Sequence, residues 1–474
     1  MSDRLDGIDR AVFRRYASLA LPRHVSYPMP TWWWELSGAD AAAMLQASRA
    51  RRPAADLSLY VHVPFCERTC RYCACTRVVQ PKDCAGASER TEAYVAALVR
   101  ELDLLAEHLG RRTRVRQVHW GGGTPTYLAP EQLARVQRRI GELFDIQSDA
   151  ELAIELDPRV TTPTILAALR TLGFNRASLG VQDLDPRVQE HVARIQPVSL
   201  VRETVAACRE LGFESVNFDL IYGLPLQTPD SIRQTLEQTI ALGPDRIAYY
   251  QYAQIPDKIA AQRGLDCTNL PDSEQKLEMY LLGQELLPAA GYVFIGLDHF
   301  AKPQERLARA LRDGTLQRNF QGMTTGGNLD LIGVGASSIG QLQRIGYVQN
   351  HRAIDDYLAA VTAGRSPICR GKRFTAADIV RHTVISQIYC LAEIRPAEVE
   401  AQTGVEFASY FARELGLLRE LAADGLVAHH ADGRIILTDP LGRVLMRTVG
   451  AVFDAYLAPD AYRVGDRQYF SANA

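Results

Sequence analysis

Nine cysteines occur in this 474-residue chain, and four of them lie within ten residues, at Cys66, Cys70, Cys73 and Cys75. Clustered thiols are typical of metal ligands or redox groups, whereas isolated cysteines usually act as small core side chains. The first three have the spacing C-x3-C-x2-C. Three thiolates on one short loop fit three corners of a [4Fe–4S] cube and leave the fourth iron open for chemistry.

A structural zinc site is the alternative interpretation of this loop. Tetrahedral zinc needs four ligands at suitable geometry, and Cys75 is too close in sequence to Cys73 to be the obvious fourth. The spacing therefore favours an iron–sulfur cluster.

Other residue types suited to ligand binding follow the ends of successive predicted strands. They are the glycine-rich run at 121–126, Glu155, Gln182 with Asp183, and Asp219 within the run 217–223. Taken singly, a glycine run can be a tight turn and a strand-end carboxylate can be a solvated charge. In a barrel of parallel strands, however, groups at the carboxyl ends of the strands gather at one face, where active sites form.

The elements that must position these residues alternate between strand and helix. Apolar runs predict strands at residues 57–63, 115–120, 152–156, 176–180, 216–221 and 246–250. Leucines at helical spacing predict a helix at 92–109, Thr162 and Pro163 suit the start of another, and a further helix at 272–290 precedes a strand at 292–297. Repeated strand–helix units imply a parallel sheet, and this number of units favours a full or partial α/β barrel.

The ends of the chain differ from this pattern. Residues 1–55 are rich in proline, lack periodicity and contain the run Trp32-Trp33-Trp34, so we expect an arm that aromatic burial pins to the body or that closes over the site. We assign residues 56–365 to the barrel. Residues 366–474 combine helices with an Asp432-Gly433 hairpin signal, which predicts a mostly helical, winged-helix-like domain.

Taken together, the motifs resemble those of oxygen-independent coproporphyrinogen III dehydrogenase, a family of the radical S-adenosylmethionine (SAM) superfamily. They read YVHVPFCERTCRYCAC, VHWGGGTPTYL, ELDPR, GFNRASLGVQD, NFDLIYGLP, GLDHFA and RNFQGMTT. The resemblance implies a partial TIM-like (βα)6-type radical SAM barrel. It also implies one [4Fe–4S] cluster on Cys66, Cys70 and Cys73, whose open iron binds SAM and yields a 5′-deoxyadenosyl radical.

The same resemblance implies two SAM molecules side by side in the barrel. Residues that match contacts of the first are Tyr60, Gly122, Glu155, Phe320, Gln321 and Ile339. Residues that match contacts of the second are Tyr72, Gly123, Thr124, Gln182, Arg194, Asp219 and Ala253. Tyr60 joins the three cysteines as an expected catalytic residue.

The reaction implied is the conversion of two propionate side chains of coproporphyrinogen III to vinyl groups, which gives protoporphyrinogen IX. An electron donor and an acceptor are needed, and the sequence identifies neither. Three features depart from the family pattern: His24 and Val25 in the arm, Ala193 before Arg194, and the triple tryptophan. They bear on substrate binding and on the second SAM, not on the cluster. The substrate carries four carboxylates, which makes Arg23 and His24 candidate ligands.

Two other function classes remain as alternatives. A heme-binding chaperone of the same superfamily generally lacks the extra cysteine and the long arm, so Cys75 and residues 1–55 favour the enzyme. A DNA-binding regulator is supported only by Arg434, Arg443 and Arg447, because a net charge of -2 argues against nucleic acid as the main partner. With no apolar run long enough to span a membrane and no signal-peptide pattern, we expect a cytoplasmic protein, and by family a monomer.

Overall fold

A computed structural model of the chain describes residues 8–110, 112–458 and 460–464. Within them, the main sheet has 13 strands in the order β1-β17-β16-β15-β14-β2-β5-β6-β7-β8-β9-β11-β10. Six successive strands in its middle pair in parallel. They are β2 (Leu57–Val63), β5 (Arg114–Gly122), β6 (Asp145–Leu156), β7 (Arg176–Gln182), β8 (Ser215–Tyr222) and β9 (Arg246–Gln251). The predicted (βα)6 unit is thus confirmed.

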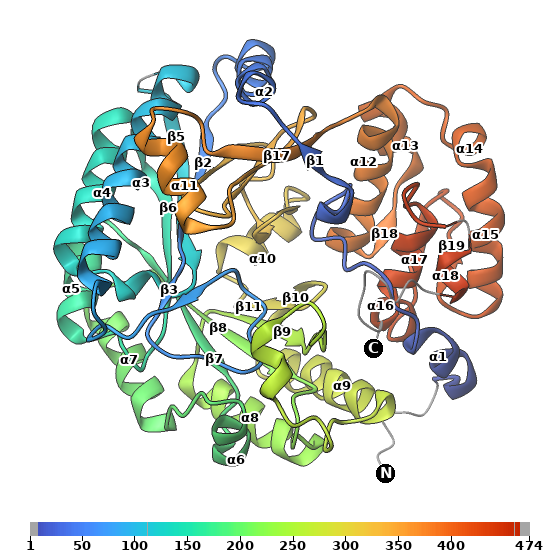
Figure 1. The fold of residues 1–474 in the computed structure, drawn as a ribbon. Coiled ribbons are helices and arrows are strands. Elements are labelled where there is room, and N and C mark those ends of the chain that lie inside the picture. The colour runs from blue at the N-terminus through green and yellow to red at the C-terminus, as the bar shows by residue number, and fades with distance from the viewer. Residues whose placement is uncertain (1–7, 111, 459, 465–474) are drawn as a thin grey trace.

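Helices follow the strands and cover the outside of the curved sheet (Figure 1). They are α3 (Ala87–Leu109), α4 (Pro130–Leu143), α5 (Pro163–Thr171), α6 (Pro186–His191), α7 (Val198–Glu210), α8 (Pro229–Leu242) and α9 (Ser273–Ala289). The predicted cap of α5 is present, since the Thr162 hydroxyl accepts a hydrogen bond from the Ile165 N–H at 3.3 Å. Leu98, Leu102 and Leu105 bury the predicted stripe of α3 against the sheet.

Beyond β9 the sheet continues with antiparallel strands. The predicted strand at 292–297 is confirmed as β10 (Val293–Gly296), which pairs with β11 (His299–Ala301). At the other edge, β14 (Asp330–Val334) runs parallel to β2, and β15 (Ile339–Leu342), β16 (Gly346–Asn350), β17 (Ile368–Arg373) and β1 (Trp34–Glu35) follow antiparallel. The sheet is therefore an open, partial barrel. The chain between these edges contains α10 (Arg306–Arg312), β12 (Gln317–Asn319) and β13 (Gly322–Thr324), whereas α11 (Ile354–Thr362) connects β16 to β17 and packs against α3.

The N-terminal segment is more regular than its sequence indicates. It holds α1 (Arg10–Ala17) and α2 (Gly38–Arg51), and α2 begins at a capping box formed by Ser37 and Asp40. The first seven residues of the expected arm lie outside the described part of the chain. Trp33 is buried and stacks on Tyr347, with ring centroids 5.0 Å apart, whereas Trp34 is 51% exposed. Aromatic packing thus pins the arm at Trp33.

The C-terminal region is mostly helical, as expected. It contains α12 (Ala376–Leu391), α13 (Pro396–Thr403), α14 (Phe407–Tyr410) and α15 (Ala412–Ala423), with a small sheet of β18 (Glu393–Ile394), β19 (Val427–His429) and β20 (Ile435–Leu437). Gly433 has φ +86° in the predicted hairpin turn. The region from 441 is not one helix, because Leu445 at φ -97° and ψ 22° separates α16 (Leu441–Val444) from α17 (Met446–Val452).

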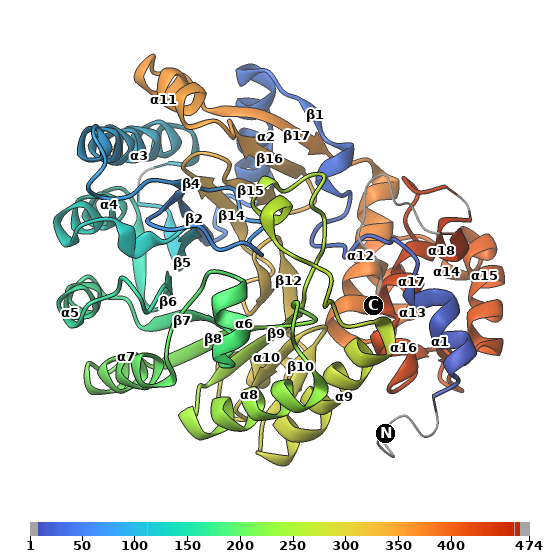
Figure 2. The same ribbon diagram turned by 60° about the horizontal axis from the view of Figure 1, so that its bottom comes forward.

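Figure 2 shows α1 beside the helices of this C-terminal region. The Tyr16 hydroxyl donates to Asp424 at 2.5 Å, just past the end of α15. A short last helix, α18 (Ala461–Val464), ends the described chain, and residues 465–474 of the expected domain lie beyond it. No helix among the described residues is long and apolar enough to cross a membrane.

Candidate functional site

The cysteine loop joins two short paired strands, β3 (Phe65–Cys66) and β4 (Val78–Val79), directly after β2. Arg77 holds the loop by its backbone. Its guanidinium donates to the carbonyl oxygens of Cys70 at 3.1 Å, of Cys73 at 3.2 Å and of Cys75 at 3.4 Å. These hydrogen bonds hold the loop through its backbone and do not occupy the thiols, which remain available as ligands.

Polar groups from the next strand ends contact the sulfur atoms. Arg159 and Arg194 donate to the Cys70 Sγ at 3.3 and 3.4 Å, and the Thr124 hydroxyl lies 3.5 Å from the Cys66 Sγ. Burial raises the pKa of Cys66 to about 11. The two guanidinium groups stabilise negative charge on the Cys70 sulfur.

This donor set fits an iron–sulfur cluster. Among the described residues, no three histidine, cysteine or acidic side chains gather as ligands of one metal ion. A cubane binds its cysteine thiolates at separate iron atoms, so the three need not converge on one point. Cys66, Cys70 and Cys73 are the residues that would hold it.

A cleft of about 470 Å³ opens from the cysteine loop across the carboxyl ends of β5 to β9. Besides the three cysteines, it is lined by most of the residues expected to bind SAM. These are Tyr72, Gly122, Gly123, Thr124, Glu155, Gln182, Arg194, Asp219, Ala253 and Gln321. The fold thus brings to one place residues that are spread over more than 250 positions of the sequence.

Three of the expected residues do not line this cleft. Tyr60 is buried behind it and stacks on His119, with ring centroids 5.8 Å apart, and His119 does line the cleft. Ile339 and Phe320 belong to an apolar cluster that includes Trp33 of the arm. Ile339 and Phe320 therefore do not line the cleft themselves, and can affect it only through the residues that pack against them.

The glycine-rich run packs against both the cysteine strand and Glu155. A Cβ on Gly123 would lie 2.8 Å from the Phe65 carbonyl oxygen, and one on Gly121 would lie 2.6 Å from the Glu155 Oε1. Gly122 has φ +114°, a conformation that other residues rarely adopt. These positions need glycine because the backbone is close-packed there, which lets it form a wall of the cleft.

Glu155 accepts the Gly122 N–H at 3.0 Å and lies 3.4 Å from His119 Nε2. Burial alone would raise the pKa of Glu155, but the contacts with His119 and Gly122 outweigh it and lower that pKa. Glu155 is therefore a carboxylate at neutral pH, able to accept from ribose hydroxyls or an ammonium group.

Asp219 differs from Glu155 in its environment. Asn217 donates to one oxygen at 2.9 Å and the Ser178 hydroxyl to the other at 3.3 Å. Burial, together with the negative charge of Glu155, raises the pKa of Asp219 to about 6. Two carboxylates in one cleft thus have pKa values shifted in opposite directions.

Comparison with known proteins decides the family. The sequence pattern of the radical SAM superfamily matches residues 60–239. A protein of Pseudomonas aeruginosa named oxygen-independent coproporphyrinogen III oxidase is 44% identical over 452 residues, which cover 95% of this chain and 96% of that protein. This chain belongs to the oxygen-independent coproporphyrinogen III oxidase family. The Escherichia coli protein of the same name is 41% identical over 453 residues, 96% of each chain.

A solved structure of this family supports the fold. The coproporphyrinogen III oxidase of Escherichia coli, described as a radical SAM enzyme, superposes with a TM-score of 0.86 at 38% sequence identity. The match covers 95% of this chain and 99% of that one. The partial barrel with its arm and helical C-terminal region is therefore the oxidase-family fold.

In this oxidase-family chain, the Arg194 side chain makes more hydrogen bonds within the protein than its sequence motif indicates. Its Nε and Nη2 both donate to the Gly180 carbonyl oxygen, at 2.9 and 2.6 Å, and its Nη1 lies 3.2 Å from Asp157. The planar edge of this guanidinium, which could otherwise bind a carboxylate through two hydrogen bonds, is thus occupied by a backbone carbonyl. Burial opposes ionisation of Asp157, but Arg194 and Arg159 lower its pKa to about 2.

The sequence reasoning missed several residues that support the site. Asp157 and Arg159 stand in the quoted ELDPR motif, so the motif itself was the available signal. Gln262, in the short helix η4 (Ala260–Gly264), donates to the carbonyl oxygens of Tyr72 at 2.9 Å and of Ala253 at 3.0 Å. Nothing in the local sequence marks it, because it bonds backbone atoms, including that of Tyr72, which is 190 residues away in the chain.

Proposed function

We propose that this chain catalyses the oxygen-independent oxidative decarboxylation of two propionate side chains of coproporphyrinogen III to vinyl groups, giving protoporphyrinogen IX. The observation that carries the proposal is the cysteine loop at the mouth of a cleft lined by family-matched polar residues, in a chain of this family. In this proposal residues 56–365 hold the cofactors, and residues 1–55 and 366–474 enclose the substrate.

Cys66, Cys70 and Cys73 hold the [4Fe–4S] cluster, and the cleft holds two SAM molecules in the positions that the resemblance gives. When bound, the cluster and SAM supply a one-electron cleavage whose product takes a hydrogen atom from the substrate. Each propionate then loses one hydrogen atom from its β-carbon, releases CO2 and gives up one electron, which leaves the vinyl group.

The chain's own residues bind and orient the cofactors and exclude solvent from the cleft. Glu155 and Asp219 accept hydrogen bonds from the hydroxyl or amino groups of the two SAM molecules. Arg194 and Arg159 stabilise the Cys70 thiolate, and Gly122 lets the backbone approach the cofactor closely. Tyr60 supports this wall of the cleft through His119. We further propose that the protein acts as a monomer in the reducing cytoplasm, with a separate electron donor and acceptor.

An anaerobic assay with coproporphyrinogen III, SAM and a reductant tests the function. We expect protoporphyrinogen IX, two equivalents of CO2 and 5′-deoxyadenosine, all abolished in Cys70→Ser, which removes one cluster ligand. Tight heme binding without any protoporphyrinogen would instead identify a heme-binding chaperone. Steep, salt-dependent DNA binding would identify a regulator.

A further inference from the structure

A second cavity, of about 140 Å³, adjoins the cleft where the barrel meets the C-terminal region. The cleft and this cavity share Gln251, Tyr252 and Ala253 as lining residues. Four cations from the arm, α9, α16 and α17 line the cavity: Arg23, Lys276, Arg443 and Arg447. Among the described residues that line it, Asp298 is the sole carboxylate. The cavity is therefore strongly positive within a chain whose net charge is -2.

The ion pairs of Arg23 and Arg443 neutralise only part of this charge. Arg23 pairs with Asp298 and lies over the ring of Tyr250, 5.1 Å from its centroid, at the wall between the cavity and the cleft. The partner of Arg443 is Asp439 at 3.4 Å, whose side chain is 66% exposed and so screened by water. Lys276 has no ion pair within 4.0 Å among the described residues, and burial lowers its pKa.

Two further groups near this wall have buried nitrogen atoms without a hydrogen-bond partner among the described residues. Arg318, on β12, has its Nε and Nη1 buried with no hydrogen-bond acceptor among the described residues. The Nδ1 of His299 is also buried and also has no hydrogen-bond partner among the described residues. Burial and then the neighbouring Arg23 lower the pKa of Arg318. Buried donors of a cation are costly to leave unsatisfied, so the donors of Arg318, close to Arg23, favour the presence of an anion near this wall.

We propose that this cavity, lined by Arg23, Lys276, Arg443 and Arg447, binds the carboxylates of those propionates that the reaction leaves intact. The inference rests on the proposed function, since it takes coproporphyrinogen III as the substrate. When one propionate of the macrocycle lies at the cysteine end of the cleft, propionates on the opposite side point away from the cluster. Guanidinium and ammonium groups are the residues that bind carboxylates most strongly, arginine through two parallel hydrogen bonds.

Lys276 and Arg443 provide the sharpest test, because both are partly exposed and neither contacts the cysteine loop. We expect Lys276→Met and Arg443→Met each to raise the KM for coproporphyrinogen III about tenfold, since one charge-assisted hydrogen bond is lost. SAM binding and the cluster absorbance should stay as in the wild type. Arg443→Lys keeps the charge and should recover most of the affinity, which a merely structural role would not predict.

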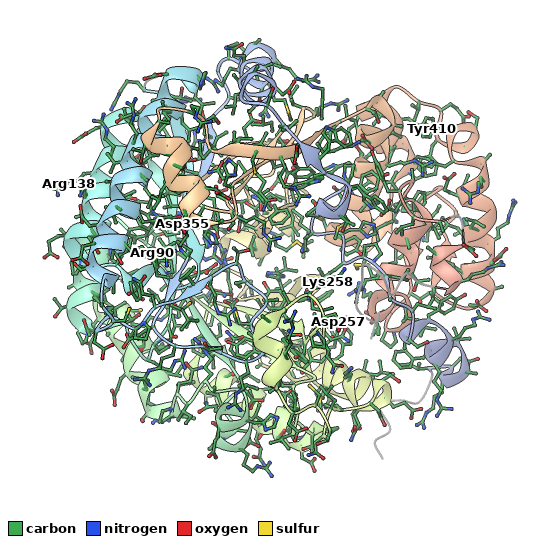
Figure 3. The ribbon with its side chains drawn as sticks, viewed as in Figure 1. Arg90, Arg138, Asp257, Lys258, Asp355 and Tyr410 are labelled. Atoms are coloured by element: carbon green, nitrogen blue, oxygen red, sulfur yellow. The ribbon has the colours of Figure 1, made fainter. Side chains whose placement is uncertain are left out.

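Arg138→Met is the matched control. Arg138 lies on the outer surface of α4, on the side of the molecule away from the C-terminal region (Figure 3), and does not line the cavity. Among the described residues, its side chain donates to the Ala134 carbonyl in its own helix. This variant removes the same charge and should leave the KM unchanged. An equal rise in KM for Arg138→Met would show a general charge effect and overturn the proposal.

A binding measurement separates this inference from the proposed function. Coproporphyrin III carries four propionates, and mesoporphyrin IX carries two propionates and two ethyl groups. We expect the wild type to prefer the first and Lys276→Met and Arg443→Met to lose that preference. Unchanged KM and unchanged preference in an active enzyme would overturn the cavity assignment alone. A wild type that cleaves SAM but forms no protoporphyrinogen would overturn the function instead.

Discussion

Three arginines hold the backbone of the cysteine loop and contact one of its sulfur atoms. Arg77 bonds three backbone carbonyls, and Arg159 and Arg194 contact the Cys70 sulfur. Three thiolates and an iron–sulfur cluster gather negative charge in one place. Arg159 and Arg194 are already held in place by Asp157, so their side chains can stabilise that charge without changing conformation.

Replacing Arg77 tests its part in this arrangement. Arg77→Met removes hydrogen bonds to the carbonyls of Cys70, Cys73 and Cys75, and we expect it to destabilise the loop by about 2 kcal/mol. Iron content after reconstitution at limiting iron should therefore fall. Arg71→Met is the control, because the Arg71 guanidinium lies on the same loop but donates to the His191 carbonyl and, among the described residues, to no carbonyl of the cysteine loop. Equal iron content in the two variants would contradict this role.

Ala193 carries backbone strain beside Arg194. It has φ +56°, the left-handed conformation, which costs an ordinary residue roughly 1–2 kcal/mol and which asparagine tolerates better. Ala193→Asn should therefore raise the free energy of unfolding by about 1 kcal/mol in a urea titration. Ala193→Val, which is β-branched, should lower it. If Ala193→Asn does not raise the free energy of unfolding, the backbone at Ala193 is not strained.

At the scale of elements, one buried carboxylate joins four segments of the barrel. Glu101 on α3 accepts from the Gly335 N–H at 2.7 Å, from Asn350 of β16 at 2.6 Å and from the Tyr357 hydroxyl of α11 at 2.7 Å. Burial raises the pKa of Glu101 to about 7, although all three hydrogen bonds oppose the shift.

This raised pKa predicts a pH-dependent stability. Between the ordinary glutamate pKa of 4.5 and about 7, the native state binds a proton that the unfolded chain does not. The contribution of Glu101 to the free energy of unfolding is therefore present at low pH and falls by ~3 kcal/mol as pH rises through that window. The difference in unfolding free energy between the wild type and Glu101→Gln should shrink accordingly. A difference independent of pH would contradict the shift.

Elements of strong local pattern could be predicted, and elements of weak pattern could not. The strand Leu57–Val63 could be predicted with its bounds because Leu57, Leu59, Val61 and Val63 alternate along it and Tyr60 is also favourable in strands. The strands from Asp330 to Arg373 were missed because they are short, interrupted by glycine and polar residues such as Gly333 and Gln341, and fixed by pairing with distant strands. Tertiary pairing, not propensity, decides such segments.

The same contrast holds for the site. The spacing of the sequence predicts the cluster ligands Cys66, Cys70 and Cys73, since one short loop carries them all. Of the cavity cations, the sequence indicates only Arg23 as a candidate substrate ligand, from its place in the arm. Lys276 and Arg443 could not be predicted as such, because they lie far from Arg23 in the chain and meet it only where the arm and the C-terminal region pack on the barrel. Physical proximity of that kind leaves no periodic signal in the chain.

The whole molecule is held together by its N-terminal segment. Arg14 pairs with Glu274 of α9, Tyr16 bonds Asp424, and buried His24 lies between Tyr389 at 3.1 Å and Asp454 at 3.0 Å. Further along, Trp33 packs against Tyr347 of the sheet. One segment thus contacts the barrel and the C-terminal region, and it carries Arg23 into the cavity between them.

Releasing the arm should therefore affect both its order and substrate binding. Trp33→Ala removes a side chain that is 6% exposed, and we expect a cost of about 3–5 kcal/mol, faster proteolytic cleavage before residue 56 and a higher KM for coproporphyrinogen III. Trp34→Ala removes a neighbouring ring that is 51% exposed and should change each quantity little. Equal protease sensitivity of the two variants would contradict the anchoring role.

The contacts of His24 and Tyr16 also set an order of events during synthesis. Their partners Asp454 and Asp424 leave the ribosome more than 400 residues later. At about 5–20 residues per second, that interval is on the order of 20–90 s. Throughout it the arm has no C-terminal surface to pack on, while the cysteine loop and the first barrel strands already exist. The growing chain therefore leaves the cluster side open to assembly and closes the substrate side only when translation is nearly complete.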